Sequence, residues 1–235
     1  MEIRRLWPLP FTSALSRRAA ILVLLWLPVH TVALRLVLTR LMLGGALTQA
    51  EATLFYYLSG CLYLVPAAFR FLRRDFDPLV EHPFLCLREM LGGYCGMYCC
   101  NYAMALLMLA LFPQAQNPND LGIAEIARQE QPVIRAALVF LAPMVEELLF
   151  RAGVFGLLRR KSRLAAYAVS TLCFAVYHIA PYAVQDPFCW IFLLEYVPAS
   201  LLLARCYERS NSIWCSIFFH MFNNGVAFAA ISALS

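Results

Sequence analysis

The chain has 235 residues, of which 62% are hydrophobic and 14% are charged, and its formal net charge is +5 at pH 7. So apolar a composition excludes a soluble globular domain and predicts an integral membrane protein. The basic residues form no stripe with interleaved aromatic residues. The sequence therefore indicates contact with the lipid bilayer and its anionic lipids, and no nucleic acid partner.

Runs of about 20 apolar residues predict helices that cross the membrane. Seven such runs follow one another along the chain: 19–39, 52–72, 90–112, 135–158, 164–184, 188–205 and 213–233. We therefore predict an all-α fold, a polytopic transmembrane helical bundle of about seven spans. Pro28 and Arg35 interrupt the first run, which favours a retained helix over a cleaved secretion signal.

Arginine and lysine concentrate in the loops on one side of these spans, as they do in cytoplasmic loops. The loops on that side carry Arg4, Arg5, Arg17, Arg18, Arg70, Arg73, Arg74, Arg88, Arg159, Arg160, Lys161, Arg163, Arg205 and Arg209. The opposite side carries little beyond Arg40 and Arg128. The pattern predicts a cytoplasmic N-terminus in a multi-pass protein, located in the plasma (inner) membrane if the source is bacterial.

The polarity of the sequence divides the chain into three parts. Residues 1–112 have aromatic-rich borders and few polar groups, which indicates amino-terminal transmembrane helices that anchor and pack. Residues 113–134 form a polar connecting segment, in which Asn119 or Asp120 is expected to cap a short surface helix. Residues 135–235 hold the polar motifs described next and are the expected catalytic transmembrane core.

Two adjacent acids, Glu146 and Glu147, lie in the middle of an apolar run, with Arg151 one turn further on. Carboxylates at bilayer depth are costly, so they usually face the protein interior and mark a chemical site. The spacing of four favours an ion pair between Glu147 and Arg151, while Glu146 is rotated away by about 100°. We expect Arg151 to hold Glu147 ionised and Glu146 to be desolvated and free to take a proton, as a general base must.

A structural interpretation of the same residues stays open. Glu147 and Arg151 could form an ion-paired clamp between helices, or Arg151 could extend to the cytoplasmic face. Such roles suit a supporting pair, but they account poorly for Glu146, a second acid with no partner.

Two further polar pairs lie on later spans. Phe174 and His178 are one helical turn apart, and so are His220 and Asn224. A lone histidine is more often a core residue than a catalyst, but the intramembrane glutamates favour a functional role here. The motifs differ in depth by roughly 10 Å along their spans, which helix tilt and a break near Pro143 would close.

These three motifs resemble, in order and spacing, the EExxxR, FxxxH and HxxxN motifs of the CPBP family of intramembrane glutamic proteases. The family includes the type II CAAX prenyl endopeptidases and bacterial bacteriocin-processing or self-immunity proteases. The resemblance covers about residues 115–230. It implies an intramembrane endopeptidase that needs no metal or other cofactor and cleaves membrane-associated proteins or peptides.

The resemblance also implies a role for each motif residue. Glu146 would activate a water molecule for attack on a peptide carbonyl, and His178 would help to hold that water. His220 and Asn224 would line an oxyanion hole, and Glu147 with Arg151 would brace the helix. Phe174 would support His178 from one turn before it.

One region departs from the family pattern. Where family members often have glycine spacing in the helix after the second motif, this chain has Ser200 and Ala204, which keep the small-residue packing. Glu195, on the same predicted span, has no family counterpart. It is expected to act as a local hydrogen-bond partner, a substrate contact or a proton relay.

The sequence is compatible with several alternatives. Glu146, His178 and His220 could supply three ligands to zinc, although no HExxH motif is present. A non-catalytic immunity protein or scaffold would retain the polar cluster for packing or for binding a toxin. A proton-coupled transporter would use the same residues as a relay, but the inverted repeats typical of transporters are not apparent.

Overall fold

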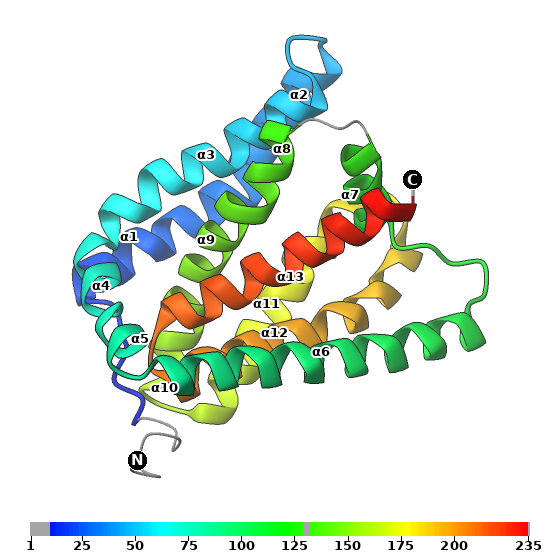
Figure 1. Ribbon diagram of the computed structural model, residues 1–235. Helices are drawn as coiled ribbons and strands as arrows, with labels where there is room; N and C mark the ends of the chain where they lie inside the picture. Colours follow the sequence, from blue (N-terminus) through cyan, green and yellow to red (C-terminus); the bar gives the residue numbers. More distant parts are fainter. Residues whose placement is uncertain (1–9, 129–131, 235) are drawn as a thin grey trace.

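The computed structural model describes residues 10–128 and 132–234. Every regular element within these ranges is a helix, so the predicted all-α fold is confirmed (Figure 1). Arg4 and Arg5, two of the residues used to predict the orientation, lie outside the described residues.

The first part of the bundle is a pair of antiparallel helices. Helix α1 (Arg17–Pro28) passes through a π-helical segment (Val29–Leu34) into α2 (Arg35–Leu43), and together they form an apolar helix of 27 residues. A turn at Gly45, whose φ of +72° favours glycine, reverses the chain into α3 (Gln49–Ala67). Helix α3 then runs back along α1 and α2 (Figure 1).

The chain next turns along one end of the bundle and returns across it. Helix α3 and the short pair α4 (Phe69–Arg74) and α5 (Asp77–Glu81) are bent by 74° at their junction. Helix α6 (Pro83–Leu111) follows and packs along α12 and α13.

The polar connecting segment contains α7 (Pro118–Arg128), whose N-terminus differs from the prediction. The side-chain oxygen of Asn117 accepts a hydrogen bond from the backbone N–H of Asn119 at 3.0 Å, so the capping contact comes from Asn117 and not from Asn119 or Asp120. Pro118 explains the shift, because proline suits the first helical position and the cap then precedes it.

A continuous helical run through the middle of the bundle, hereafter the central run, carries the acidic motif. It consists of α8 (Pro132–Ala136), a π-helical segment (Ala137–Leu141), α9 (Ala142–Glu146), a second π-helical segment (Glu147–Phe155) and α10 (Gly156–Arg159). π-Helical turns are rare and often occur at functional sites. The irregularity expected near Pro143 thus takes the form of π turns on both sides of α9.

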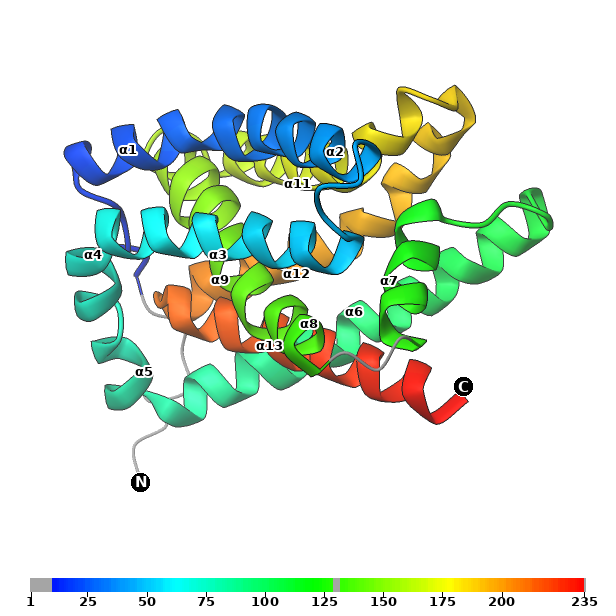
Figure 2. The ribbon, with the colours of Figure 1, turned by 90° about the horizontal axis from the view of Figure 1, so that it is seen from above.

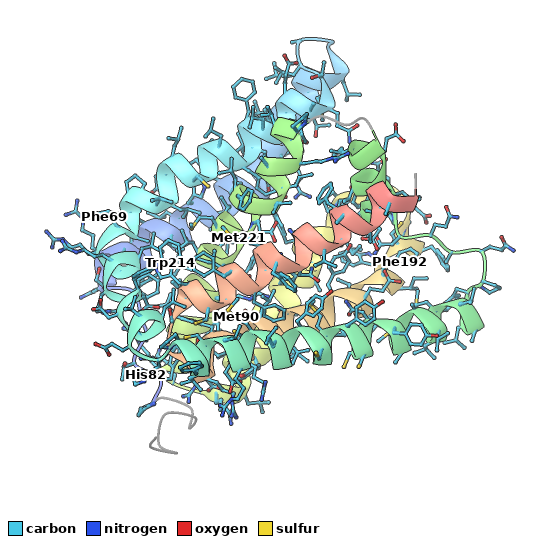
Figure 3. All side chains as sticks on the ribbon, in the orientation of Figure 1. Phe69, His82, Met90, Phe192, Trp214 and Met221 are labelled. Atoms are coloured by element: carbon cyan, nitrogen blue, oxygen red, sulfur yellow. The ribbon has the colours of Figure 1, made fainter. Side chains whose placement is uncertain are left out.

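Three more helices complete the fold. Helix α11 (Arg163–Ala183) is followed by a 3-10 segment (Pro187–Phe192), by α12 (Leu193–Ser210) and by α13 (Ile213–Leu234). Trp214 lies near the start of α13 (Figure 3). It fixes this end of the helix, because its indole N–H donates to the carbonyl of Leu72 at 2.8 Å.

Among the residues that the structure describes, five helices are long and apolar enough to cross a membrane, or up to six if the bent pair of α3 with α4 and α5 counts as one span. We expected about seven spans. The expected span 135–158 is helical throughout but is absent from this set. It differs from the others in carrying Glu146, Glu147 and Arg151 near its middle.

The central run is enclosed by the rest of the bundle. Segment α9 contacts α3 and α13, and the π-helical segment after it contacts α1, α11 and α13 (Figure 2). Helices α3 and α9 approach closely at Gly60, where an added Cβ would come within 2.8 Å of Val145 Cγ2. Large apolar side chains such as Leu25, Leu62 and Leu109 are exposed on the outer helices, as lipid-facing residues are.

The helix ends that carry the predicted cytoplasmic arginines gather at one end of the bundle (Figure 1). Arg74 donates to the carbonyl of Ala14, Arg160 donates to the carbonyl of Leu15, and Arg209 pairs with Glu89. Basic residues far apart in sequence therefore lie on a common face. That this face is the cytoplasmic one stays a prediction.

Candidate active site

A cavity of about 450 Å³ lies within the bundle, and the candidate motifs from three helical segments meet on its wall. Its lining includes Glu146, Phe174, His178, His220 and Asn224. The expected difference in depth between the motifs is thus closed by the way the helices pack.

Glu147 and Arg151 form the expected ion pair, with 3.4 Å between Arg151 Nε and Glu147 Oε2. Both side chains are fully buried, which excludes an Arg151 that extends to the membrane surface. Glu147 has two further partners: Ser216 Oγ donates to Oε2 at 2.5 Å, and His220 Nδ1 lies 2.9 Å from Oε1. The pair therefore also fixes α13 against the central run.

Glu146 points away from Arg151 and toward the two histidines. Its Oε2 lies 3.8 Å from His178 Nε2 and 3.7 Å from His220 Nε2, and Tyr57 Oη donates to its Oε1 at 3.4 Å. Only 3% of the residue surface is exposed. Glu146 is thus a carboxylate without a cationic arginine or lysine partner in the described part of the chain, as the helix spacing predicted.

His178 is held in one orientation by its surroundings. Its Nδ1 lies 2.8 Å from the carbonyl oxygen of Phe174, which leaves Nε2 facing Glu146. The ring stacks on Tyr196 with centroids 4.6 Å apart. The Phe174 ring contacts the His178 ring, and its centre also lies 4.2 Å from the guanidinium carbon of Arg151. Phe174 therefore links the motif of His178 to that of Glu147 and Arg151.

Asn224 is anchored to the central run. Its side-chain amide N–H donates to the carbonyl of Leu138 at 3.1 Å, and its oxygen accepts from Asn223. An amide NH₂ has two hydrogens, so one donor remains for the cavity.

Two contacts of the glutamates were missed in the sequence. Tyr57 lies in the amino-terminal part of the chain, which was expected only to anchor and pack, yet it reaches Glu146 from α3. Ser216 gave no signal, although it lies one helical turn before His220, on the face of α13 that meets the glutamates. The cavity draws on both the amino-terminal helices and the expected catalytic core.

Ser200 and Glu195, the departures from the family pattern, each have a hydrogen-bond partner. Arg151 Nη2 lies 3.4 Å from Ser200 Oγ, so the hydroxyl replaces part of the solvation of the buried guanidinium. Asn117 Nδ2 donates to Glu195 Oε2 at 2.6 Å at the cavity wall. Of the roles expected for Glu195, the contact with Asn117 makes it a local hydrogen-bond partner.

Asp120, on α7, also lines the cavity. Tyr196 Oη donates to its carboxylate at 3.3 Å. Loss of solvent around this carboxyl raises the pKa of Asp120 above its usual value, and the hydrogen bonds from Tyr196 and Asn119 oppose the rise.

The zinc alternative rests on Glu146, His178 and His220. Within residues 10–128 and 132–234, no group of three His, Cys, Asp or Glu side chains has a geometry that could hold a metal ion.

Residues 128–226 match the family model of the type II CAAX prenyl endopeptidase Rce1-like family, which confirms the resemblance predicted from the motifs. The chain is also similar to UPF0177 protein YxdF of Lactococcus lactis subsp. lactis (strain IL1403). The two are 29% identical over 136 residues, which is 57% of this chain and 71% of that protein. No solved structure matches this chain. At the level of the family, these findings support a membrane protease of the CAAX type.

Proposed function

We propose that this chain, whose residues 128–226 match the Rce1-like family, is an intramembrane glutamic endopeptidase. Glu146 would act as the general base that activates a water molecule for attack on a peptide carbonyl. The observation that carries the proposal is the convergence of Glu146, His178 and His220 on one buried cavity.

The distances around Glu146 support a shared water. Gaps of 3.8 Å to His178 and 3.7 Å to His220 are too long for direct hydrogen bonds and suit a molecule that contacts both sides. His178 donates its Nδ1 proton to the Phe174 carbonyl, so a neutral ring has an acceptor at Nε2. That acceptor and the Glu146 carboxylate would together orient the water.

His220 is suited to stabilise the developing oxyanion. Its Nδ1 faces the Glu147 carboxylate, which can only accept, so Nδ1 carries a proton. With a hydrogen on Nε2 as well, His220 and the remaining amide donor of Asn224, both on the cavity wall, would bind the oxyanion.

In this mechanism Glu147 and Arg151 are positioning residues. Glu147 orients His220 as a carboxylate orients a catalytic histidine, and Arg151 keeps Glu147 ionised. Neither needs to touch the substrate.

The expected substrates are membrane-associated proteins or peptides. They are either short carboxy-terminal segments of lipid-anchored or membrane-tethered proteins, or leader peptides of small secreted peptides. If the source is bacterial, the protein would act in the plasma (inner) membrane.

The test compares cells with and without the protein for truncated membrane proteins and peptides, and then repeats the cleavage with purified protein in lipid nanodiscs. Glu146→Gln should lower the rate by about 10²–10⁴-fold, the usual contribution of a general base. Glu81→Gln, an exposed acid on α5, is the matched control and should retain the rate.

Equal cleavage by the wild type and Glu146→Gln would overturn the glutamic mechanism. Loss of cleavage on chelation and its return with added zinc would favour the metalloprotease instead. A phenotype that survives Glu146→Gln in cells would favour the non-catalytic immunity or scaffold role.

A further inference from the structure

Arg35, at the start of α2, contributes a positive charge to the cavity wall. The side chain is half-buried, and its guanidinium carbon lies 5.4 Å from the centre of the Tyr56 ring and 5.0 Å from that of Tyr177. Two aromatic faces thus hold the planar group in a fixed orientation.

The guanidinium of Arg35 has few polar partners. It donates to the carbonyl of Tyr177 and to the hydroxyl of Tyr56, both at 3.4 Å. In the described part of the chain, no carboxylate lies within ion-pair distance of it. A guanidinium has five N–H donors, so most of them remain for a ligand in the cavity.

An arginine within an apolar bundle is expensive unless an anion compensates it, and its partner marks function. Arg35 has no such anion in the described part of the protein, although it lines the same cavity as Glu146. The fork of N–H groups matches a carboxylate in shape and charge. We propose that Arg35 binds a carboxylate of the peptide substrate and thereby sets the direction in which the peptide lies in the cavity.

This proposal rests on the proposed function, because it assumes that the cavity holds a peptide. Tyr56 and Tyr57 connect the two sites: Arg35 donates to Tyr56, the two tyrosine rings are 5.1 Å apart, and Tyr57 donates to Glu146. A peptide carboxylate on Arg35 would therefore anchor one side of the substrate while the bond to be cleaved lies at Glu146.

The remaining charges of the cavity favour a carboxylate over a phosphate. Asp120, Glu146 and Glu195 also line the cavity, so a group with two negative charges would meet about twice the repulsion that a single charge meets. The carboxylate has two possible sources, the carboxy-terminus of the peptide and an Asp or Glu side chain.

Binding can be measured without cleavage in the full-length Glu146→Gln variant in nanodiscs. The probes are a fluorescent apolar peptide with a free carboxy-terminus, the same peptide as its terminal amide, and the amide with one internal glutamate. Fluorescence anisotropy should give at least tenfold tighter binding, about 1.4 kcal/mol, for a probe with the recognised carboxylate than for the amide. The first and third probes distinguish the two sources.

Adding Arg35→Gln should remove this preference. Arg35→Lys keeps the charge but not the fork of N–H groups, so part of the preference should remain. This second variant keeps the test valid if Arg35→Gln does not fold. Arg40→Gln, at an exposed position on the same helix, is the matched control and should bind like its parent.

Three results would overturn the proposal: equal affinity for all probes, no binding of any probe, or a preference that is undiminished in the Arg35 variants that fold. The readout is binding and not hydrolysis. Failure of the glutamic mechanism in the cleavage test would therefore leave a positive result here intact, and the reverse also holds.

Discussion

The buried ion pair of Glu147 and Arg151 predicts a specific pattern of stability. Both side chains have 0% exposure, and their charged atoms are 3.4 Å apart. Replacing one partner leaves the other as an uncompensated buried charge, whereas replacing both removes the two charges together. Arg151→Met alone should therefore lower the free energy of unfolding much more than the double variant that also carries Glu147→Gln.

The magnitude follows from the contacts of the pair. Loss of one partner of a buried ion pair lowers the free energy of unfolding by about 3–5 kcal/mol. Glu147 keeps Ser216 and His220 when Arg151 is replaced, so we expect the lower end, about 3 kcal/mol. For a chain of this size that corresponds to a fall in Tm of about 6–12 °C.

The double variant should recover at least half of this loss. The amide oxygen that Glu147→Gln introduces can still accept from Ser216 and from His220 Nδ1, so both of these buried donors keep a partner. The coupling energy between the two substitutions should be about 1.5 kcal/mol or more.

The assay is thermal unfolding of the purified variants in the same detergent, followed by tryptophan fluorescence. Arg163→Met is the control, because Arg163 also pairs with a carboxylate, Glu208, but its side chain is 65% exposed. Arg163→Met should lower the free energy of unfolding by at most about 1 kcal/mol. The explanation fails if Arg151→Met is no worse than Arg163→Met, or if the effects of Arg151→Met and Glu147→Gln simply add.

Two smaller changes test other parts of the cavity. Tyr57→Phe removes the hydroxyl that donates to Glu146 at 3.4 Å, a bond worth about 0.5–1.5 kcal/mol, so kcat should fall about two- to twelvefold with KM unchanged. Tyr63→Phe on the same helix is the control, and equal kcat in the two variants would contradict a role for Tyr57. Because solvent loss raises the pKa of Asp120, the wild type loses stability as pH rises through that pKa, and Asp120→Asn should not. The Tm of Asp120→Asn should thus exceed that of the wild type near neutral pH and converge with it in acid, and a difference independent of pH would refute this explanation.

The motifs were recognisable because they depend on local geometry. Within one helix, residues four apart lie on the same face whatever surrounds them, so the pairing of Glu147 with Arg151 and the separate direction of Glu146 followed from spacing alone. The membrane class followed as directly, because composition determines the solvent in which the chain can fold.

The contacts between helices depended on packing, which spacing does not encode. Tyr57, Arg35 and Ser216 come from helices far from Glu146 in sequence, and their approach depends on helix rotation and on the close contact at Gly60. The capping residue of α7 and the partner of Glu195 were likewise decided by Asn117, which lies far from Glu195 along the chain.

The sequence by itself therefore determined the fold class, the acidic motif and the residues that face a common interior, because helical periodicity and hydrophobicity act over a few turns. Only the tertiary structure decided which residues complete the cavity. The π-helical segments on both sides of α9 shift the helical register, so the directions of Glu146 and Glu147 relative to α3 and α13 depend on how the whole bundle packs.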